Sequence, residues 1–567
     1  MLKSITIPRS RASHPMPLLR LFSVLLILSL LLIPGATFAA SGAAPRSTIN
    51  IQILDISDWH GQLDPQSITG IGNVGGAAVL STYFKADRAA NPNTLTLTAG
   101  DAVGATPPLS NYFNDEPAIF AMNLMGIQVD TFGNHNFDGG IAHLQHLIDL
   151  ADFQFVSANL QNRDNNLTGV KDFEIFDVGG VKIGVIGITN PEAPTLVFPG
   201  SFGTITPTDP VKAALKARNA AKDAGAEIVV VICHLGVTSF DLSGAPAGPL
   251  IDFAKAVNKN GVKVDLIIGD HTDVQYQGII NGALVLENKS KGVTYAKINL
   301  AVDAVNHKIL GQSATFVVPV ASAVTPDPAI VAMLAPYRTQ LSQIFDTPVA
   351  VATDLFPRGG TPSVERSGEA ALGDLVADSL RLKYGTQLAL TNAGGIRASL
   401  PSSYAPADLT LRRTAAPYVI GPPYDIVIGD VFAVLPFGNT VVTRTVTGAQ
   451  LWAALENGVS QISSATCTGA DGRFPQISGF KFTFKCSNPV GSRVLSVSLT
   501  DDTPIPADST TYTFATNNFV NAGGDFYSVL NDGQGTTREN MFDVTLAYIQ
   551  DLGVITPTID GRITKVP

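Results

Sequence analysis

Short apolar runs alternate with longer amphipathic stretches through the first half of the chain. Apolar runs of this length predict buried strands, and the stretches between them predict helices. The runs lie at residues 51–56, 94–98, 182–188, 228–232 and 266–268. Alternation of this kind is typical of an α/β domain, in which helices cover a sheet. We therefore predict such a domain over residues 48–321.

The pattern changes at about residue 322. Proline-rich sequence is followed there by a helical stretch at 329–345, which we interpret as part of a connection spanning residues 322–350. A second module, predicted to be α+β, then runs from 351 to 567. Its expected helices lie at 370–384 and 449–460, and its expected strands at 426–435, 496–499 and 510–515.

The first 40 residues have the pattern of a removable export signal. Basic residues precede an apolar run at 21–33, and small residues follow around Ala36, Ala39 and Ala40. A membrane anchor is the alternative, but a run of this length spans only about 20 Å as a helix, less than the roughly 30 Å of a hydrocarbon core. We expect a mature protein without a membrane span, located at the cell surface, in the periplasm or outside the cell.

Composition and charge narrow the function classes. The chain is globular in composition, with 45% hydrophobic and 15% charged residues. Its net charge of −10, without a cluster of Lys or Arg beyond the signal, speaks against binding to a nucleic-acid polymer. A polyanionic substrate would need a local positive site, which bound metal ions could supply. The oligomeric state is not indicated.

Three cysteines are too few for a disulfide-dense scaffold. Cys467 and Cys486 flank a Gly/Asp-rich turn and a strand-like run at 480–484, so they could pair in an oxidising compartment. Two unpaired thiols are the alternative. Cys233 follows a predicted buried strand, and we expect it to be a core thiol.

Polar clusters that contain metal-ligand side chains follow several of the predicted strands. An Asp-x-His pair alone is more often a cap and a surface histidine. Here, however, four of the seven histidines beyond the signal lie in such clusters, and carboxylate, imidazole and Asn oxygen atoms are all competent metal ligands. The clusters are Asp58-Trp59-His60, Gly100-Asp101, Gly133-Asn134-His135-Asn136-Phe137-Asp138, Cys233-His234 and Gly269-Asp270-His271-Thr272-Asp273.

The order of these clusters closely resembles the calcineurin-like metallophosphatase domain of the 5′-nucleotidase family. The resemblance implies an αββα sandwich and two divalent metal ions, such as Mn²⁺, Zn²⁺ or Mg²⁺. It assigns one ion to Asp58, His60, Asp101, His271 and Asp273, and the other to Asp101, Asn134 and His234.

The resemblance also implies a catalytic pair. His135 would stabilise charge on the phosphoryl group or the leaving oxygen, and Asp138 would orient it. Asp138 could in addition cap a helix predicted at 139–150. Two positions depart from the family pattern: Asp273 stands where His or Gln is usual, and Asn136 where Glu is usual. A further carboxylate at the ligands would favour Mn²⁺ or Mg²⁺ over Zn²⁺.

Three segments of the second module resemble the C-terminal domain of 5′-nucleotidases. They are Thr391–Arg397, Leu435–Asn439 and Asn518–Asp525, which combine glycines, aromatics and an Arg. The resemblance implies that two aromatics enclose the base, while polar side chains contact the base, the ribose and the phosphate; Arg366 is a further candidate for the phosphate. The residues are Phe437, Phe519, Asn392, Asp525 and Arg397.

The expected activity is hydrolysis of nucleoside 5′-phosphates to nucleoside and phosphate. A nucleotide-sugar or dinucleotide pyrophosphatase and a 2′,3′-cyclic phosphodiesterase would use the same machinery. An inactive nucleotide-binding protein on the same scaffold is a rival from another class. The resemblance also implies that the second domain rotates, with residues 322–351 as the hinge.

Overall fold

Two β-sheets share one buried core in the first half of the chain. Ile53 from the first sheet and Val230 from the second both belong to it. The first sheet has the order β19 (Ile309–Val317), β18 (Tyr295–Asp303), β1 (Thr48–Asp55), β4 (Thr94–Leu97), β5 (Val129–Asp130), β6 (Gln154–Val156) and β8 (Val170–Lys171). The second has the order β16 (Tyr276–Ile280), β17 (Ala283–Glu287), β15 (Leu266–Gly269), β12 (Ile228–Cys233), β10 (Val181–Ile188) and β9 (Phe173–Val178).

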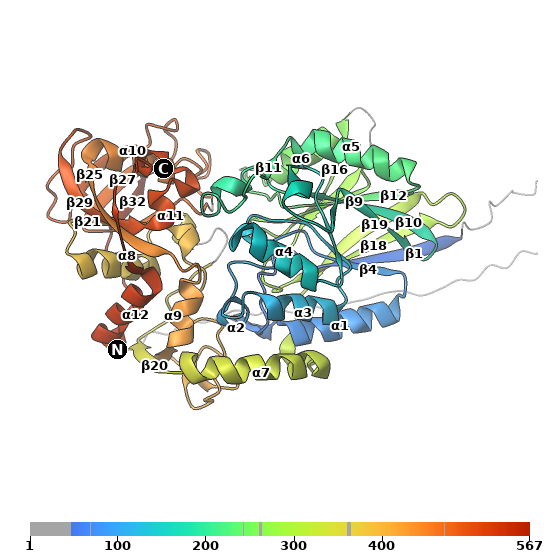
Figure 1. The fold of residues 1–567 in the computed structure, drawn as a ribbon, viewed down its shortest axis with the longest axis horizontal. Coiled ribbons are helices and arrows are strands. Elements are labelled where there is room, and N and C mark those ends of the chain that lie inside the picture. The colour runs from blue at the N-terminus through green and yellow to red at the C-terminus, as the bar shows by residue number, and fades with distance from the viewer. Residues whose placement is uncertain are drawn as a thin grey trace, which may run out of the picture. The chain divides into compact units, whose positions relative to one another are not determined.

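Helices cover the outer faces of both sheets (Figure 1). One layer packs against Leu54 of β1 and contains α1 (Ala77–Ala90), α3 (Glu116–Met125) and α4 (Gly140–Leu150). The other packs against Val231 of β12 and contains α5 (Pro210–Asp223) and α6 (Pro249–Val257). The result is the αββα arrangement that the resemblance implied.

The computed structural model describes residues 47–68, 70–241, 243–259, 264–359, 364–469 and 471–566. The expected signal peptide at 1–40 lies outside these ranges. Within them, no helix is both long enough and apolar enough to cross a membrane.

The helix expected at 329–345 is α7 (Pro328–Phe345). It begins where the Asp327 side chain accepts a hydrogen bond from the Ala329 N–H at 3.1 Å. Its apolar side chains, including Ile330 and Leu334, are buried in the same core as α1 and α3. In the described part of the chain, the strands of each sheet come either all before or all after α7 in the sequence.

Three sheets form the framework of the second half. The largest has the order β26 (Pro475–Ser478), β21 (Leu388–Asn392), β29 (Thr511–Asn517), β25 (Thr440–Thr447) and β30 (Thr536–Asn540). The others are β24 (Tyr424–Val427), β20 (Pro348–Ala352) and β31 (Val554–Ile555), and β28 (Val494–Leu499), β27 (Phe480–Lys485) and β32 (Ile563–Val566). Their helices include α8 (Ala371–Tyr384), α10 (Gly448–Gly458), α11 (Asn518–Asn521) and α12 (Met541–Leu552).

One predicted strand in this half is wrong. Residues 426–435 divide into the end of β24 and a helix, α9 (Ile428–Val434). Asp430 accepts a hydrogen bond from the Val427 N–H at 3.0 Å and is paired with the buried Arg413, which favours a helical turn here. A short apolar run has the same appearance in a buried strand and a buried helix, so the pattern alone could not separate them.

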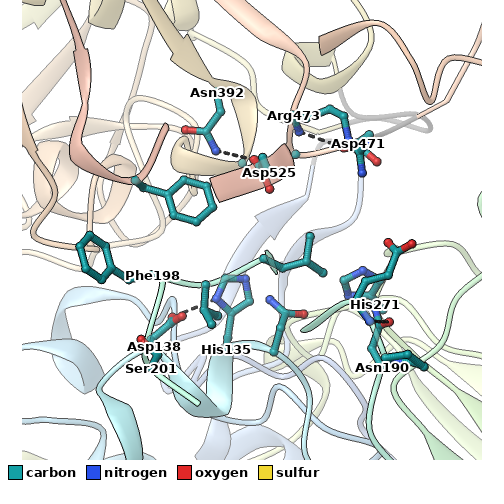
Figure 2. Close-up of a pocket in the computed structure, with 18 of the residues that line it drawn as sticks. His135, Asp138, Asn190, Phe198, Ser201, His271, Asn392, Asp471, Arg473 and Asp525 are labelled. Atoms are coloured by element: carbon teal, nitrogen blue, oxygen red, sulfur yellow. Dashed lines mark hydrogen bonds and ion pairs between the residues drawn. The ribbon is translucent and has the colours of Figure 1, made fainter. Parts of the chain in front are cut away.

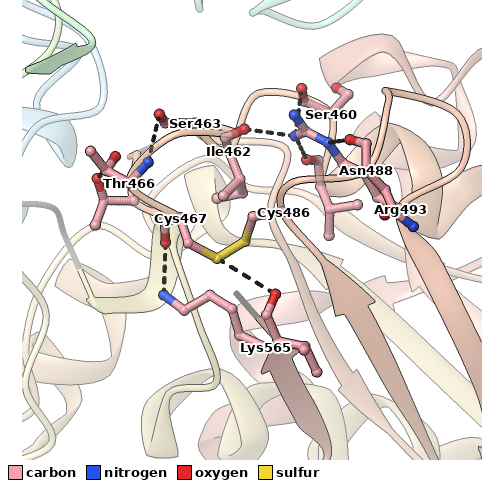
Figure 3. The surroundings of a disulfide bond; sticks show 12 residues. Ser460, Ile462, Ser463, Thr466, Cys467, Cys486, Asn488, Arg493 and Lys565 are labelled. Carbon is pink, nitrogen blue, oxygen red and sulfur yellow. Dashed lines mark hydrogen bonds between the residues drawn. A yellow bond between two sulfur atoms is a disulfide. The ribbon is translucent and has the colours of Figure 1, made fainter. Parts of the chain in front are cut away.

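A disulfide links Cys467 to Cys486, which confirms that pairing (Figure 3). It ties the loop that follows α10 to the end of β27. Beside it, Lys565 Nζ donates to the Cys467 carbonyl at 3.1 Å, and Arg493 donates to the Ile462 carbonyl at 2.7 Å. Cys233 is a buried free thiol in β12, as predicted, and burial raises its pKa.

Candidate functional site

The polar clusters lie on the loops that follow parallel strands of both sheets. Asp58 follows β1, Asp101 follows β4, and Asn134 follows β5; His234 and His271 follow β12 and β15 of the other sheet. Parallel neighbours end at the same edge, so the two sheets bring their loops to one place. Several of these residues have the left-handed backbone that side chains rarely adopt, with φ of 55° at Asp58 and 47° at Asp101. Such strain typically collects at functional sites.

Two groups of metal-ligand atoms share Asp101. Asp58, His60 and Asp101 form one group, and Asp101, His234 and His271 form the other; within each group the atoms lie within 4.8 Å of one another. His60 Nε2 is 3.3 Å from Asp58 Oδ1, and His234 Nε2 is 3.0 Å from Asp101 Oδ2. A shared carboxylate is the arrangement that a bridging ligand requires.

His271 stands with the second group and not the first, where the resemblance had assigned it. Its Nδ1 lies 3.0 Å from His234 Nε2. Burial and the neighbouring His234 lower the pKa of His271 to about 4, so its imidazole is neutral and able to coordinate a cation.

The donor set suits divalent cations. Oδ1 of Asn134, the atom expected to bind metal, is buried and has no hydrogen-bond partner among the described residues. Buried polar atoms are nearly always satisfied in native proteins, so an unpartnered ligand atom on a loop that contacts Asp101 fits a cation site. The residues therefore fit a centre for divalent metals.

Asp273 is not in either group of ligand atoms. Burial opposes its ionisation, but the guanidinium groups of Arg358 and Arg366 hold its pKa below the usual range. These basic groups come from the second half of the chain. The preference for Mn²⁺ or Mg²⁺ that rests on Asp273 as a ligand stays a prediction.

Asp270 is a functional candidate that the motif contained but to which the sequence analysis gave no role. Its side chain is fully buried, and its Oδ2 lies 3.6 Å from His234 Nδ1, on the ring edge opposite the atom that faces Asp101. That oxygen has no hydrogen-bond partner among the described residues. Metal-bound histidines commonly direct their other ring nitrogen at a carboxylate, and this position is suited to that role. The sequence signal that could have identified Asp270 is its position as an acidic residue directly before a candidate ligand, His271.

His135 and Asp138 form the expected pair. His135 Nδ1 and Asp138 Oδ2 are 2.9 Å apart, and the Ala105 N–H donates to the same oxygen at 3.2 Å. The Asp138 side chain is directed at His135 and not at the N-terminus of α4, whose N-cap is Gly139. Asn136 accepts hydrogen bonds from the N–H groups of Asp101, at 3.1 Å, and Gly133, at 2.8 Å. It therefore braces the two ligand loops against each other.

A cavity of about 1170 Å³ is lined by Asn134, His135, Asp138 and His271 and by residues of the second half of the chain. Figure 2 shows Asn392, Asp471, Arg473 and Asp525 on one side of it, with His135 and Asp138 opposite. All six substrate residues expected from the sequence line this cavity: Arg366, Asn392, Arg397, Phe437, Phe519 and Asp525.

Arg397 and Phe437 extend toward the metal ligands. The Arg397 guanidinium lies 5.6 Å from the Phe437 ring centre, and its Nη2 is 3.4 Å from His60 Nε2. The Phe437 ring is stacked on His135 at 5.6 Å. Lys291, which the motif analysis missed, donates from Nζ to the Arg397 carbonyl at 2.9 Å. A phosphate bound here would meet positive charge next to the candidate metal ligands.

The far end of the cavity is polar. Asn392 Nδ2 donates to Asp525 Oδ2 at 2.7 Å, and Arg473 Nε donates to Asp471 Oδ1 at 2.9 Å. Burial, together with the nearby Asp471, raises the pKa of Asp525 to about 6. Phe198, exposed on a loop of the first half, also borders the cavity (Figure 2). Neither Phe198 nor Asp471 lies in a motif that marked it beforehand.

Comparison with known proteins gives consistent matches. A family model described as 5′-nucleotidase, C-terminal domain, matches residues 348–532. Endonuclease YhcR of Bacillus subtilis (strain 168) is 28% identical and covers 93% of this chain, which spans 42% of YhcR. Cell wall protein Lmo0130 of Listeria monocytogenes serovar 1/2a is 27% identical over 95% of this chain and 72% of that protein.

The match to solved structures extends to most of the chain. A 5′-nucleotidase precursor from Thermus thermophilus has a TM-score of 0.78 and 28% sequence identity, covering 91% of this chain and 99% of that one. The family model and the structural likeness agree: residues 348–532 match the C-terminal domain of 5′-nucleotidases, and the chain is similar to a 5′-nucleotidase over most of its length, with candidate ligands for divalent metals.

Proposed function

We propose that this protein hydrolyses nucleoside 5′-phosphates to nucleoside and phosphate, using two divalent metal ions. The observation that carries the proposal is a cavity lined by two of the candidate ligands, Asn134 and His271, by the His135–Asp138 pair and by the six nucleotide-binding candidates. The name of the Thermus relative adds support.

One ion would be held by Asp58, His60 and Asp101, and the other by Asp101, Asn134, His234 and His271. Bound divalent ions at such a centre activate a water molecule and neutralise charge on a phosphoryl group.

The chain's own residues would position the substrate and handle the proton. Arg397 and Arg366 would hold the phosphate, and Phe437 and Phe519 would enclose the base. Stacking of this kind tolerates different bases, because every base has a π-face. Asp525 would accept hydrogen bonds from ribose hydroxyls. Among the described residues His135 Nε2 has no hydrogen-bond partner, while Nδ1 contacts Asp138, so Nε2 could donate a proton or a hydrogen bond to the leaving oxygen.

We also propose the division into domains at 48–321 and 351–567, with the hinge near the end of α7. The division is supported by the sheets, because no sheet in the described part of the chain combines strands from before and after α7. Ile330 and Leu334 of α7 lie in the core shared with α1 and α3, whereas Phe345 at its end contacts Phe432 of the second half, which supports a pivot near this end of the helix.

Export through the segment at 1–40 is a further proposal, supported by the name of the cell wall relative.

Chromatographic analysis of the products, together with phosphate release, from AMP, ADP, ATP, 2′,3′-cyclic AMP and a UDP-sugar with Mn²⁺, Mg²⁺ and Zn²⁺ in turn tests the proposal. We expect metal-dependent release from AMP, abolished in Asp101→Ala. Activity confined to the cyclic or pyrophosphate substrates would overturn the choice of substrate. Nucleotide binding without release at any metal would establish an inactive binding protein instead.

A further inference from the structure

A buried carboxylate, which is neither a candidate metal ligand nor a candidate substrate residue, holds the loop at residues 104–106. This loop contacts both His60 and Asp138. We propose that Asp115 is a positioning residue, which fixes residues 104–106 and through them both the His60 ring and the Asp138 carboxylate. The inference rests on the proposed function for its catalytic part. Nothing in the sequence motifs marks Asp115, which lies at the N-terminus of α3.

Asp115 is 4% exposed, and both of its carboxylate oxygens accept hydrogen bonds from residues 104–110. Its Oδ2 accepts a hydrogen bond from the Gly104 N–H at 2.9 Å. Its Oδ1 accepts from the hydroxyl of Thr106 and, at 3.0 Å, from that of Ser110. A carboxylate that receives three donors in a buried setting is a strong anchor, because charge-assisted hydrogen bonds are the stronger class.

The anchored loop touches both functional groups directly. The Gly104 carbonyl accepts a hydrogen bond from His60 Nδ1 at 2.8 Å, which leaves Nε2, the nitrogen beside Asp58, as the candidate ligand atom. The next residue, Ala105, donates its N–H to Asp138 Oδ2, the oxygen that His135 Nδ1 also contacts. The single peptide group between Gly104 and Ala105 therefore orients both a metal-ligand candidate and the catalytic pair.

The loop needs an anchor because its backbone is strained. Ala105 has φ of 49°, and Asp115 itself has φ of 61°, both in the left-handed region that costs free energy for residues with a Cβ. Gly104 has φ of 80°, and a Cβ there would meet the His135 carbonyl oxygen at 2.0 Å. Without the carboxylate, Ala105 would be free to relax and withdraw its N–H from Asp138.

The φ of Asp115 permits a sharp test. Asp115→Gly suits the left-handed backbone and removes both acceptors, so it should fold while losing the anchor. Asp115→Asn keeps the shape and one good acceptor. Asn114→Gly is the matched control, since Asn114 is adjacent, exposed and also left-handed, with φ of 53°.

We expect Asp115→Gly to lower kcat on AMP and the affinity for Mn²⁺ by roughly 10–100-fold, and to speed hydrogen exchange at the amides of Gly104 and Ala105. Asp115→Asn should fall between it and the wild type, and Asn114→Gly should match the wild type. Faster exchange with unchanged kcat and Mn²⁺ affinity would overturn the inference and leave Asp115 a purely structural residue.

If the wild type releases no phosphate from any nucleotide, the proposed function fails. Mn²⁺ affinity, measured by calorimetry, and amide exchange still decide whether Asp115 positions His60. If Asp115→Gly does not fold, the Asn variant provides the same comparison.

Discussion

The His135–Asp138 pair offers the sharpest test of the proposed chemistry, through Asp138→Asn. The substitution keeps the size of the side chain and can still present one oxygen to His135 Nδ1, at 2.9 Å, and to the Ala105 N–H, at 3.2 Å. It removes the negative charge that would stabilise a protonated imidazole. The side chains of His135 and Asp138 are 13% and 23% exposed, so solvent compensates only partly for the lost charge.

General acid catalysis typically contributes about 10²–10⁴ in rate. Because Asp138 acts through His135 and is partly exposed, we expect the lower end, a loss in kcat of about 100-fold on AMP. That corresponds to about 2.7 kcal/mol in the activation barrier.

The assay compares AMP with an aryl phosphate whose leaving group departs without a proton. Asp138→Asn should slow AMP hydrolysis much more than aryl ester hydrolysis, because only the alcohol leaving group needs the acid. Glu116→Gln is the matched control: Glu116 forms a similar pair with His146 at 2.8 Å, but on the exposed surface. Equal losses on both substrates, or no loss on either, would refute the role of the pair as acid and orienter.

Four further outcomes are expected. First, kcat/KM for AMP should fall as pH drops through about 6, because burial raises the pKa of Asp525 to about 6 and protonation replaces a charged acceptor of the ribose hydroxyls with a weaker, neutral one. A pH profile that keeps this limb in Asp525→Asn would contradict the assignment. Second, Phe437→Ala should raise KM for AMP by about 10-fold with little change in kcat, since stacking contributes about 1–3 kcal/mol per base; steady-state kinetics with an unchanged KM would count against base stacking. Third, Asp270→Asn should weaken Mn²⁺ binding by about 10–100-fold in calorimetry if its carboxylate orients His234, and wild-type affinity would remove that role. Fourth, Cys467→Ser opens a 19-residue separation and should lower the free energy of unfolding in urea by about 3 kcal/mol, without altering KM; an unchanged midpoint would show that the loop is held by other contacts.

Much of the fold could be predicted because its signals are local. The apolar runs at 94–98 and 228–232 are strands β4 and β12, and the stretch at 329–345 is helix α7. In each case the run length and the flanking polar or proline residues specify the element without help from distant contacts. Where the local signal was ambiguous, as at 426–435, the outcome depended on the Asp430–Arg413 pair, which joins separate segments.

The site divides in the same way. That Asp58, His60, Asp101 and His234 would gather could be expected, because each follows a strand and parallel strands end at one edge. The direction in which each side chain points on the loop after its strand could not be predicted. His271 stands beside His234, and Asp273 lies in the field of Arg358 and Arg366, because the left-handed turns after β15 and charges from the second half of the chain decide between them.

The sequence by itself indicated the resemblance to 5′-nucleotidases, the strands that carry the ligand loops, the identity of the candidate ligands and six of the residues that line the cavity. Only the tertiary structure decided how the ligands divide around Asp101, that Asp270 lies behind His234, and that Asp115 holds the loop between His60 and Asp138. The physical reason is one of range: strand and helix patterns are encoded within a few residues, whereas a side chain's partners come from segments that meet only when the sheets and the second half have packed.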